Sequence, residues 1–162
     1  MEYSIEKFET GYLMVNTWVF PLNEKSVAVI DPGGLSPELS QYLDKLHPTH
    51  LEIMLTHGHF DHVGGLPALV RKYSDYRLWI HEKDAAYLGA AGTETHFKSF
   101  APLHVQKLIE PLEKHPLPDP TDFYKEGDNV NGFTVLYTPG HTQGSICLWN
   151  KEAGILFSGD TL

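Results

Sequence analysis

The stretch 56-THGHFDHVGG-65 places three histidines and an aspartate within six consecutive positions and follows them with two glycines. It directly follows the apolar run 51-LEIMLT-56, which is typical of a buried strand. Loops just past the ends of strands are where α/β sheets usually place their ligand sites. The chain holds ten histidines, whereas average usage would give about four. An incidental, solvated polar loop is the alternative, but ligand type, spacing and position together favour a metal site.

The spacing within this stretch differs from that of helical metal motifs. His57, His59 and Asp61 lie two positions apart, so an extended backbone would project them from one face and His62 from the other. All four side chains could converge only if the chain folds back, and we expect Gly64-Gly65 to allow a tight turn into the next helix. Imidazole with carboxylate is a ligand set suited to zinc, and to iron or manganese where carboxylates dominate.

Two later segments add candidate ligands. In 137-YTPGHTQGS-145, His141 follows a predicted strand and a Pro-Gly turn, which should expose its imidazole at the same edge of the sheet. In 155-ILFSGDTL-162, Asp160 follows an apolar strand and a glycine, where a buried charge would need a partner. Taken singly, the first could be an ordinary loop histidine and the second a turn or N-cap aspartate.

The alternation of strands and helices predicts a single α/β domain spanning residues 1–162. Ser36 is the expected N-cap of a helix that starts at Pro37 and ends before His47-Pro48. Pro102 and Pro111 should limit any helix over 99–114. The other predicted helices cover 64–73 and 82–88, and the predicted strands cover 3–8, 12–20, 26–30, 51–56, 77–80, 133–138, 145–150 and 155–158.

Composition narrows the class of protein. Of 162 residues, 12 are Lys or Arg and 21 are Asp or Glu, a net charge of -9, which argues against a nucleic-acid partner. The single cysteine, Cys147, cannot form an intramolecular disulfide and is expected to be a buried apolar residue. The start MEYSIEKFET does not resemble a signal peptide, and no apolar run approaches the length of a membrane span. We therefore expect a cytoplasmic protein with no membrane partner.

Four segments in this order and spacing resemble the metallo-β-lactamase superfamily of metal-dependent hydrolases. They are A-V-I-D-P-G-G (28–34), T-H-G-H-F-D-H-V-G-G (56–65), T-P-G-H-T-Q-G-S (138–145) and F-S-G-D-T-L (157–162). The resemblance is strongest to the glyoxalase II branch, which hydrolyses hydroxyacylglutathione thioesters. It implies an αββα sandwich, a small-molecule substrate such as a glutathione thioester, and one or two Zn²⁺ ions.

The resemblance also implies a role for each candidate ligand. His57, His59 and His141 would hold a first metal, Asp61 and His62 a second, and Asp160 would bridge the two. Asp61 would be catalytic as well, since it would orient the metal-activated hydroxide that attacks a carbonyl. Asp31, in the V-I-D-P-G-G turn, is expected to tie loops together beneath the site rather than to bind metal.

The chain departs from the resemblance at its end. Related chains continue beyond the equivalent of Leu162 and supply one more histidine to the second metal. We therefore expect a sandwich that is incomplete on its C-terminal side, a truncated or partial chain, and self-association through surface left uncovered. Two alternatives stay open: an inactive metal-binding fragment, and a mononuclear iron persulfide dioxygenase whose iron the resemblance places on His57, His141 and Asp160.

The other histidines carry no motif. His81 follows the predicted strand 77–80 and should lie at the surface or behind the ligands. A loop or helix-surface position is expected for the remaining five, His47, His50, His96, His104 and His115.

Overall fold

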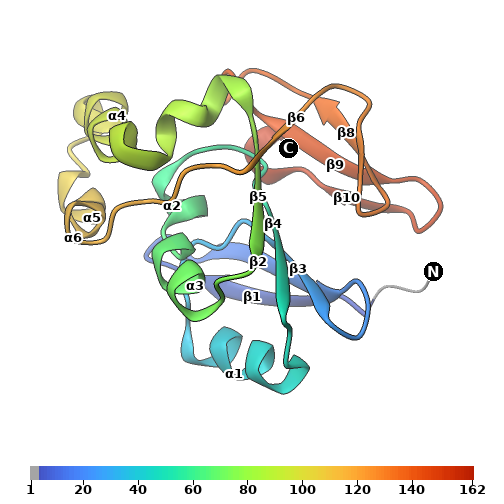
Figure 1. Cartoon of the computed structure of the whole chain (residues 1–162). Helices are drawn as coiled ribbons and strands as arrows, with labels where there is room; N and C mark the ends of the chain where they lie inside the picture. Colours follow the sequence, from blue (N-terminus) through green and yellow to red (C-terminus); the bar gives the residue numbers. More distant parts are fainter. Residues whose placement is uncertain (1–3) are drawn as a thin grey trace.

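The computed structural model describes residues 4–162, which form two β-sheets and several helices (Figure 1). The larger sheet has six strands in chain order, and its first three strands are antiparallel, whereas β3 to β6 run parallel. Tyr3, the first residue of the predicted strand 3–8, lies outside the described residues. The strands are β1 (Glu6–Thr10), β2 (Val15–Pro21), β3 (Ser26–Ile30), β4 (His50–Met54), β5 (Tyr76–His81) and β6 (Asp122–Tyr124).

The smaller sheet has four antiparallel strands in the order β10-β9-β8-β7. They are β7 (Asn129–Val130), β8 (Phe133–Tyr137), β9 (Ile146–Asn150) and β10 (Ile155–Phe157). In β8, Phe133 and Val135 are fully buried, and the intervening Thr134 is only half-buried, as expected for a sheet with one covered face. The buried side chains of this sheet pack against those of the larger sheet, including Phe20, Ile30 and Met54, so the two sheets share one core layer.

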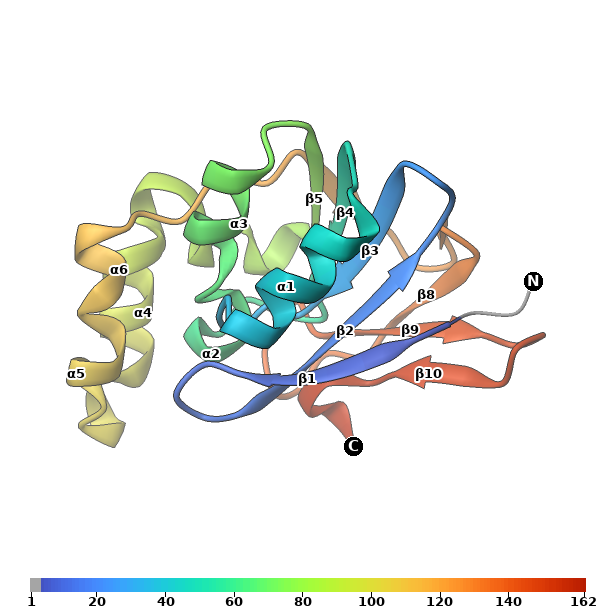
Figure 2. The same ribbon diagram turned by 90° about the horizontal axis from the view of Figure 1, so that it is seen from below.

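A second core layer lies between the larger sheet and two helices, α1 (Pro37–Leu46) and α3 (Leu66–Lys72). Figure 2 shows both helices on the face of the sheet that points away from β8, β9 and β10. As predicted, α1 has Pro37 in its first turn, and the Ser36 hydroxyl accepts a hydrogen bond from the backbone N–H of Leu39. Leu39 and Leu43, one turn apart, form the buried stripe of this helix.

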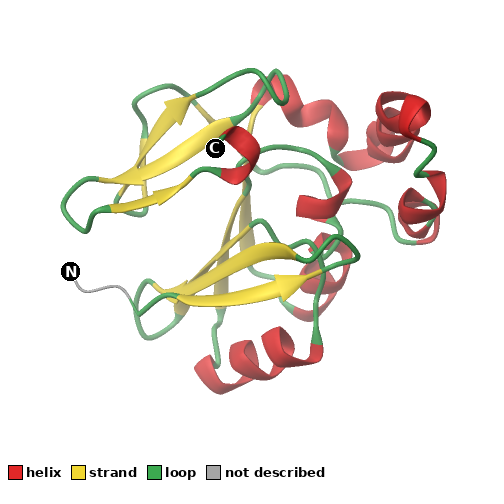
Figure 3. Cartoon of the chain, turned by 180° about the vertical axis from the view of Figure 1, so that it is seen from behind, coloured by secondary structure: helices red, strands yellow, loops and turns green. Residues whose placement is uncertain are grey.

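The prediction of an α/β fold is therefore confirmed. Within residues 4–162 the outer face of the smaller sheet carries no α-helix, only a turn of 3-10 helix, η4 (Gly159–Thr161), at its end (Figure 3). None of the helices in the described part of the chain combines the length and apolar character that a membrane span requires.

The prediction for 12–20 was wrong at its start, because residues 11–14 form a hairpin turn. Gly11 and Met14 adopt positive φ angles of 70° and 53°, so β2 begins only at Val15. This turn leaves three apolar side chains, Tyr12, Leu13 and Met14, largely exposed.

The region 82–114 contains more helical residues than predicted, and they are divided among several short helices. The expected helix 82–88 is a 3-10 helix, η1 (Glu82–Tyr87). The expected helix over 99–114 is instead a series of short pieces, and Pro102 and Pro111 each lie in the first turn of a new one. The series starts before 99, with η2 (Gly89–Ala91) and α4 (Gly92–Phe100), and continues with η3 (Ala101–Leu103), α5 (Gln106–Ile109) and α6 (Pro111–Lys114).

The backbone of the histidine stretch stops being extended after His59, and the change of direction that convergence of the ligands requires is a helical turn. His59 is extended, with φ -67° and ψ 148°, but it is the N-cap of a short helix, α2 (Phe60–Val63). The helix forms because Phe60 and Val63, three residues apart, both point into the core. Asp61 and His62 therefore take their directions from a helical turn and not from a strand.

Candidate metal centre

Three segments distant in sequence bring the candidate ligands together at the carboxyl ends of their strands. His57 and His59 follow β4, His141 follows β8 and Asp160 follows β10. The ligand atoms of His57, His59 and His141 all lie within 4.8 Å of one another. The same limit holds for a second group, made of His57, His62 and Asp160. The structure thus gathers five of the six predicted ligands into two adjoining groups that share His57.

Asp61 is the predicted ligand that neither group includes. One of its carboxylate oxygens lies 3.8 Å from Nε2 of His62, and burial raises the pKa of its carboxyl group. It lines a cavity of about 350 Å³ together with His62, Asp160 and the hairpin residues Leu13 and Met14. Asp61 therefore faces the space beside the two groups.

The hydrogen bonds of His57 identify which ring nitrogen is free for a metal. The Thr56 hydroxyl donates its only hydrogen to Oδ2 of Asp31, at 2.6 Å. It can therefore only accept from Nδ1–H of His57, 3.1 Å away. The other nitrogen, Nε2, then carries a lone pair, and it is buried with no hydrogen-bond partner among residues 4–162. A buried lone pair without a partner is costly unless a ligand such as a metal ion binds it.

The imidazoles of the first group are poised as neutral ligands. Burial, with neighbouring imidazoles adding to it, lowers the pKa of His57 and lowers that of His59 to about 4. Both rings are therefore uncharged near neutral pH, the state in which histidine binds a metal.

His62 differs, because carboxylates surround it. Its Nδ1 lies 3.1 Å from Asp31 and its Nε2 lies 3.2 Å from Asp160. Burial alone would lower the pKa of His62, but Asp31, Asp160 and Asp61 together raise it to about 10. The hydrogen bond from His62 in turn lowers the pKa of Asp160. This second group therefore stabilises a positive charge, whether a proton or a divalent cation. The side chains of both groups, imidazoles in the first and imidazoles with a carboxylate in the second, are ligands that fit divalent metals.

Asp31 ties together the strand ends beneath the site, as its motif predicts. Its carboxylate accepts hydrogen bonds from both the N–H and the hydroxyl of Thr56, at 2.8 and 2.6 Å. The two glycines after the histidines form the predicted turn into α3, and they also allow close packing. A Cβ on Gly64 would lie 2.7 Å from the carbonyl oxygen of Gly33, and one on Gly65 would lie 2.7 Å from that of Pro32. They are needed for the close approach of two backbones.

The prediction that His96 lies in a loop or on a helix surface was wrong. Its side chain is completely buried, and its two ring nitrogens lie 2.8 and 3.0 Å from the carbonyl oxygens of Gly92 and Gly58. Burial lowers its pKa, so the neutral ring donates to one of these carbonyls at a time. The hydrophobic environment of α4 against Phe60 and Phe100 explains its burial.

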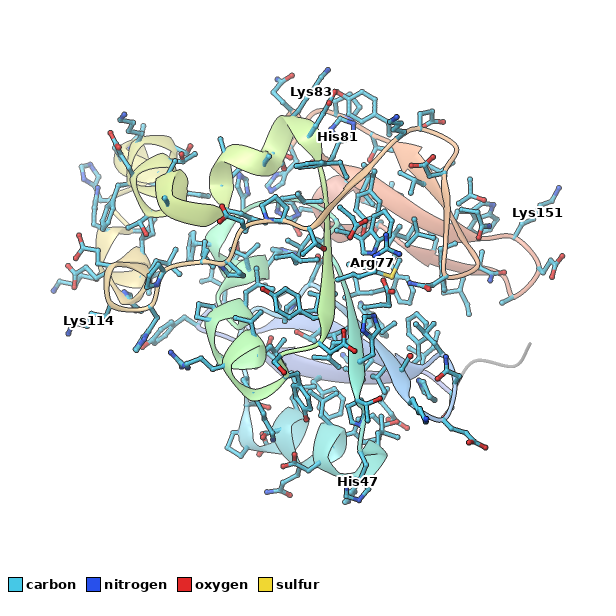
Figure 4. The ribbon with its side chains drawn as sticks, viewed as in Figure 1. His47, Arg77, His81, Lys83, Lys114 and Lys151 are labelled. Atoms are coloured by element: carbon cyan, nitrogen blue, oxygen red, sulfur yellow. The ribbon has the colours of Figure 1, made fainter. Side chains whose placement is uncertain are left out.

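The other histidines lie outside both groups. His50 was also misplaced by the prediction, because it begins β4 and binds Glu52 and Asp75. His81 is buried and stacked on Tyr137, with ring centroids 4.5 Å apart, and Figure 4 shows it beside Lys83. Cys147 is buried, as predicted, and His47, His104 and His115 occupy positions after helical segments.

Sequence reasoning missed the residues that support the ligands from behind. Asp84 and Thr142 are buried and hydrogen-bonded to each other, and Asp84 also contacts the loop of His57 and His59. Asp84 lies in no motif, and an acid in a short polar helix gives no signal of burial.

Comparison with known proteins agrees with this geometry. The family model "Metallo-beta-lactamase superfamily" matches residues 10–162. The chain therefore belongs to the metallo-β-lactamase superfamily, a class of metal-dependent hydrolases, and its two facing sheets, with helices on the outer face of the larger one, match that fold.

Three known proteins illustrate the relationship. The chain is 30% identical over 161 residues to "Probable metallo-hydrolase YqgX" of Bacillus subtilis (strain 168), covering 96% of this chain and 70% of that one. It is 33% identical over 144 residues to "Hydroxyacylglutathione hydrolase GloC" of Haemophilus influenzae (strain ATCC 51907 / DSM 11121 / KW20 / Rd), covering 86% and 63%. The crystal structure of BLEG-1 B3 metallo-β-lactamase matches with a TM-score of 0.72 and 27% identity, covering 98% and 72%.

Proposed function

We propose that the protein is a zinc-dependent hydrolase of thioesters or esters, similar to hydroxyacylglutathione hydrolase. The observation that carries this proposal is the group of three imidazoles, His57, His59 and His141, with ligand atoms within 4.8 Å of one another. Three neutral imidazoles are a ligand set for catalytic zinc that keeps a fourth position open. The similarity to GloC supports the choice of substrate class.

Asp160 supports a pair of ions rather than one. Its Oδ1 lies 3.2 Å from Nε2 of His62, and its Oδ2 lies 3.3 Å from Nε2 of His141. Each oxygen thus faces a candidate ligand of a different ion, as a bridging carboxylate must. His57, His59 and His141 would hold the first ion, and Asp61 and His62 the second. When bound, such a pair lowers the pKa of a shared water and polarises the carbonyl of the substrate.

Asp61 would be the catalytic acid-base group of the chain itself. It lines the cavity beside both groups, and burial raises the pKa of its carboxyl group, which favours proton acceptance. In this position it would accept a hydrogen bond from the attacking water and orient it toward the carbonyl carbon.

The surroundings of the site suit a small molecule with an apolar part. Leu13, Met14 and Leu156 line the same cavity as Asp61 and are exposed, so they can cover an acyl group. The net charge of -9 gives no long-range attraction for nucleic acid. Lysines such as Lys114 and Lys151 point away from the molecule at distant edges in Figure 4 and form no basic patch there.

The test is hydrolysis of a hydroxyacylglutathione by the zinc-loaded protein, compared with its His57→Ala and His59→Ala variants. Both variants should lose nearly all activity, and a His47→Ala variant, altered at the end of α1, serves as the control. Unchanged turnover in the first two variants would refute the proposal. Absence of turnover in the zinc-loaded wild type would instead favour the inactive metal-binding alternative.

A second candidate is a mononuclear iron persulfide dioxygenase. It is favoured by the contact between His141 and Asp160, at 3.3 Å, beside His57, since two histidines and one carboxylate form a ligand set for non-haem iron. Metal analysis and oxygen uptake separate the two candidates. Bound zinc with no oxygen consumption on glutathione persulfide would exclude the dioxygenase.

A further inference from the structure

Asp84 is a buried carboxylate that connects two loops of the metal centre. It lies in η1, after β5, and only 1% of its surface is exposed. Its Oδ2 accepts hydrogen bonds from the N–H of Gly58, at 2.9 Å, and from the hydroxyl of Thr142, at 2.7 Å. Its Oδ1 accepts a third from the N–H of Gly144, at 2.7 Å. All three donors belong to the loops that carry candidate ligands.

The positions of these donors matter for the first metal. Gly58 lies between His57 and His59, and Thr142 directly follows His141. A single side chain therefore holds the two parts of the three-histidine group, although β4 and β8 belong to different sheets. The bonds cross 26 to 60 residues of sequence, so they are long-range constraints and not local turns.

Close packing leaves the loops little freedom around Asp84. A Cβ on Gly58 would lie 2.7 Å from Cβ of Tyr87, and one on Gly144 would lie 2.5 Å from Cγ of Asp84. On the other side of Gly58, its carbonyl oxygen lies 3.0 Å from Nε2 of His96. The backbone between the first two ligands is thus held from both directions by the segment 84–96.

The charge of Asp84 is as informative as its bonds. Its three neighbours all donate hydrogen bonds to it, an arrangement that suits a carboxylate. Among residues 4–162 no Lys, Arg or His lies within ion-pair distance of it. A buried negative charge without a cationic partner is costly, unless a nearby cation offsets it. The three-histidine group is the place where a divalent cation would do so.

We propose that Asp84 is a positioning residue of the first metal site, which locks its two ligand loops together and supplies a buried counter-charge for the ion. The inference rests on the proposed metal site but not on any particular substrate. Residues that orient metal ligands typically change metal affinity by about 10- to 100-fold when they are replaced.

The test compares Asp84→Asn with the wild type and with Glu52→Gln. Glu52 is a matched control, because it is also a buried carboxylate that accepts hydrogen bonds, from Trp79 and His50, but it lies in the middle of β4 and these bonds reach neither ligand loop. Zinc affinity is measured by competition with a chelator, and first-site geometry by the visible spectrum of the cobalt-substituted protein. Asp84→Asn should bind the first zinc about 10- to 100-fold more weakly and shift the cobalt spectrum. Glu52→Gln should do neither.

A folded Asp84→Asn protein with wild-type zinc affinity and cobalt spectrum would overturn the inference. If Asp84→Asn does not fold, Thr142→Val provides the measurement, since it removes one of the three donors and keeps the shape of the side chain. This variant should bind the first zinc severalfold more weakly, and an unchanged zinc affinity would contradict the inference. Because both readouts concern metal binding, they remain decisive even if the wild type hydrolyses no thioester.

Discussion

The carboxylate of Asp31 lies 3.1 Å from Nδ1 of His62 while it also accepts two hydrogen bonds from Thr56. One buried acid thus connects the end of β3, the end of β4 and the second group of candidate ligands. Its φ angle of 49° is unusual for a residue other than glycine, and the contacts explain why the backbone is held there.

Asp31→Asn should therefore weaken both stability and metal binding. The oxygen of the asparagine amide can still accept one hydrogen bond from Thr56. Its NH₂ group, however, would face the other Thr56 donor and could not accept the second bond. We expect a loss of about 1–3 kcal/mol in the free energy of unfolding, measured with urea. The second metal should also be lost first when the metal content is followed during dialysis. A variant that retains both properties would show that the contact with His62 is incidental.

Metal binding at the second group should release a proton. The pKa of His62 is raised to about 10, so this imidazole is protonated at neutral pH in the metal-free protein and must lose its proton to bind. The apparent affinity should therefore rise with pH up to about that value. Calorimetry in buffers of different ionisation enthalpy should detect about one proton released per ion at this site. A His62→Ala variant should lose this release, and equal heats in all buffers for the wild type would contradict the prediction.

His50 should make stability fall at alkaline pH. Burial alone would lower its pKa, but hydrogen bonds to Asp75 and Glu52 raise it above 6.5. The contribution to stability is therefore complete below pH 6.5 and is lost as the pH rises through the higher folded-state pKa. The pair is partly exposed, so we expect at most about 1 kcal/mol between about pH 6 and about pH 9. Urea unfolding at both pH values should show this difference in the wild type but not in His50→Gln.

Gly58→Ala should disturb the first metal site through packing alone. The new Cβ would lie 2.7 Å from Cβ of Tyr87, and overpacking of this kind costs about 1–3 kcal/mol. The melting temperature and the zinc content should both fall. Gly140→Ala is the matched control for stability, because a Cβ there has no atom within 4 Å. Equal melting temperatures for the two variants would show that the loop adjusts freely.

The described chain should self-associate at high concentration through the edge of its smaller sheet. β10 pairs only with β9, and Leu156 on that strand is 40% exposed. Exposed apolar edge strands favour association, and a lysine on the edge opposes it. Sedimentation velocity should show less association for Leu156→Lys than for Leu103→Lys, which changes a 65% exposed leucine elsewhere. Identical behaviour of both variants would place the contact at another surface.

Local sequence predicted most of the strands and the first helix closely. Apolar and β-branched runs between turn residues predict strands such as β3 and β8. A serine N-cap followed by a proline predicts the start of α1. The region 89–114 was predicted poorly because its helices are shorter than the window of residues over which hydrophobic periodicity can be read. His96 was misplaced there, since its burial depends on the carbonyl of Gly58, 38 residues away.

The sequence by itself determined the superfamily and the candidate ligands, because metal chemistry demands particular side chains after particular strands, and both are local features of the chain. Tertiary structure decided how those ligands are grouped. It showed that His57 takes part in both groups, that Asp61 faces the cavity, and that Asp160 spans His62 and His141. It alone revealed Asp84, because its hydrogen bonds join two loops, one 26 residues away along the chain and the other 58 to 60 residues away, and such bonds arise only when two sheets pack face to face.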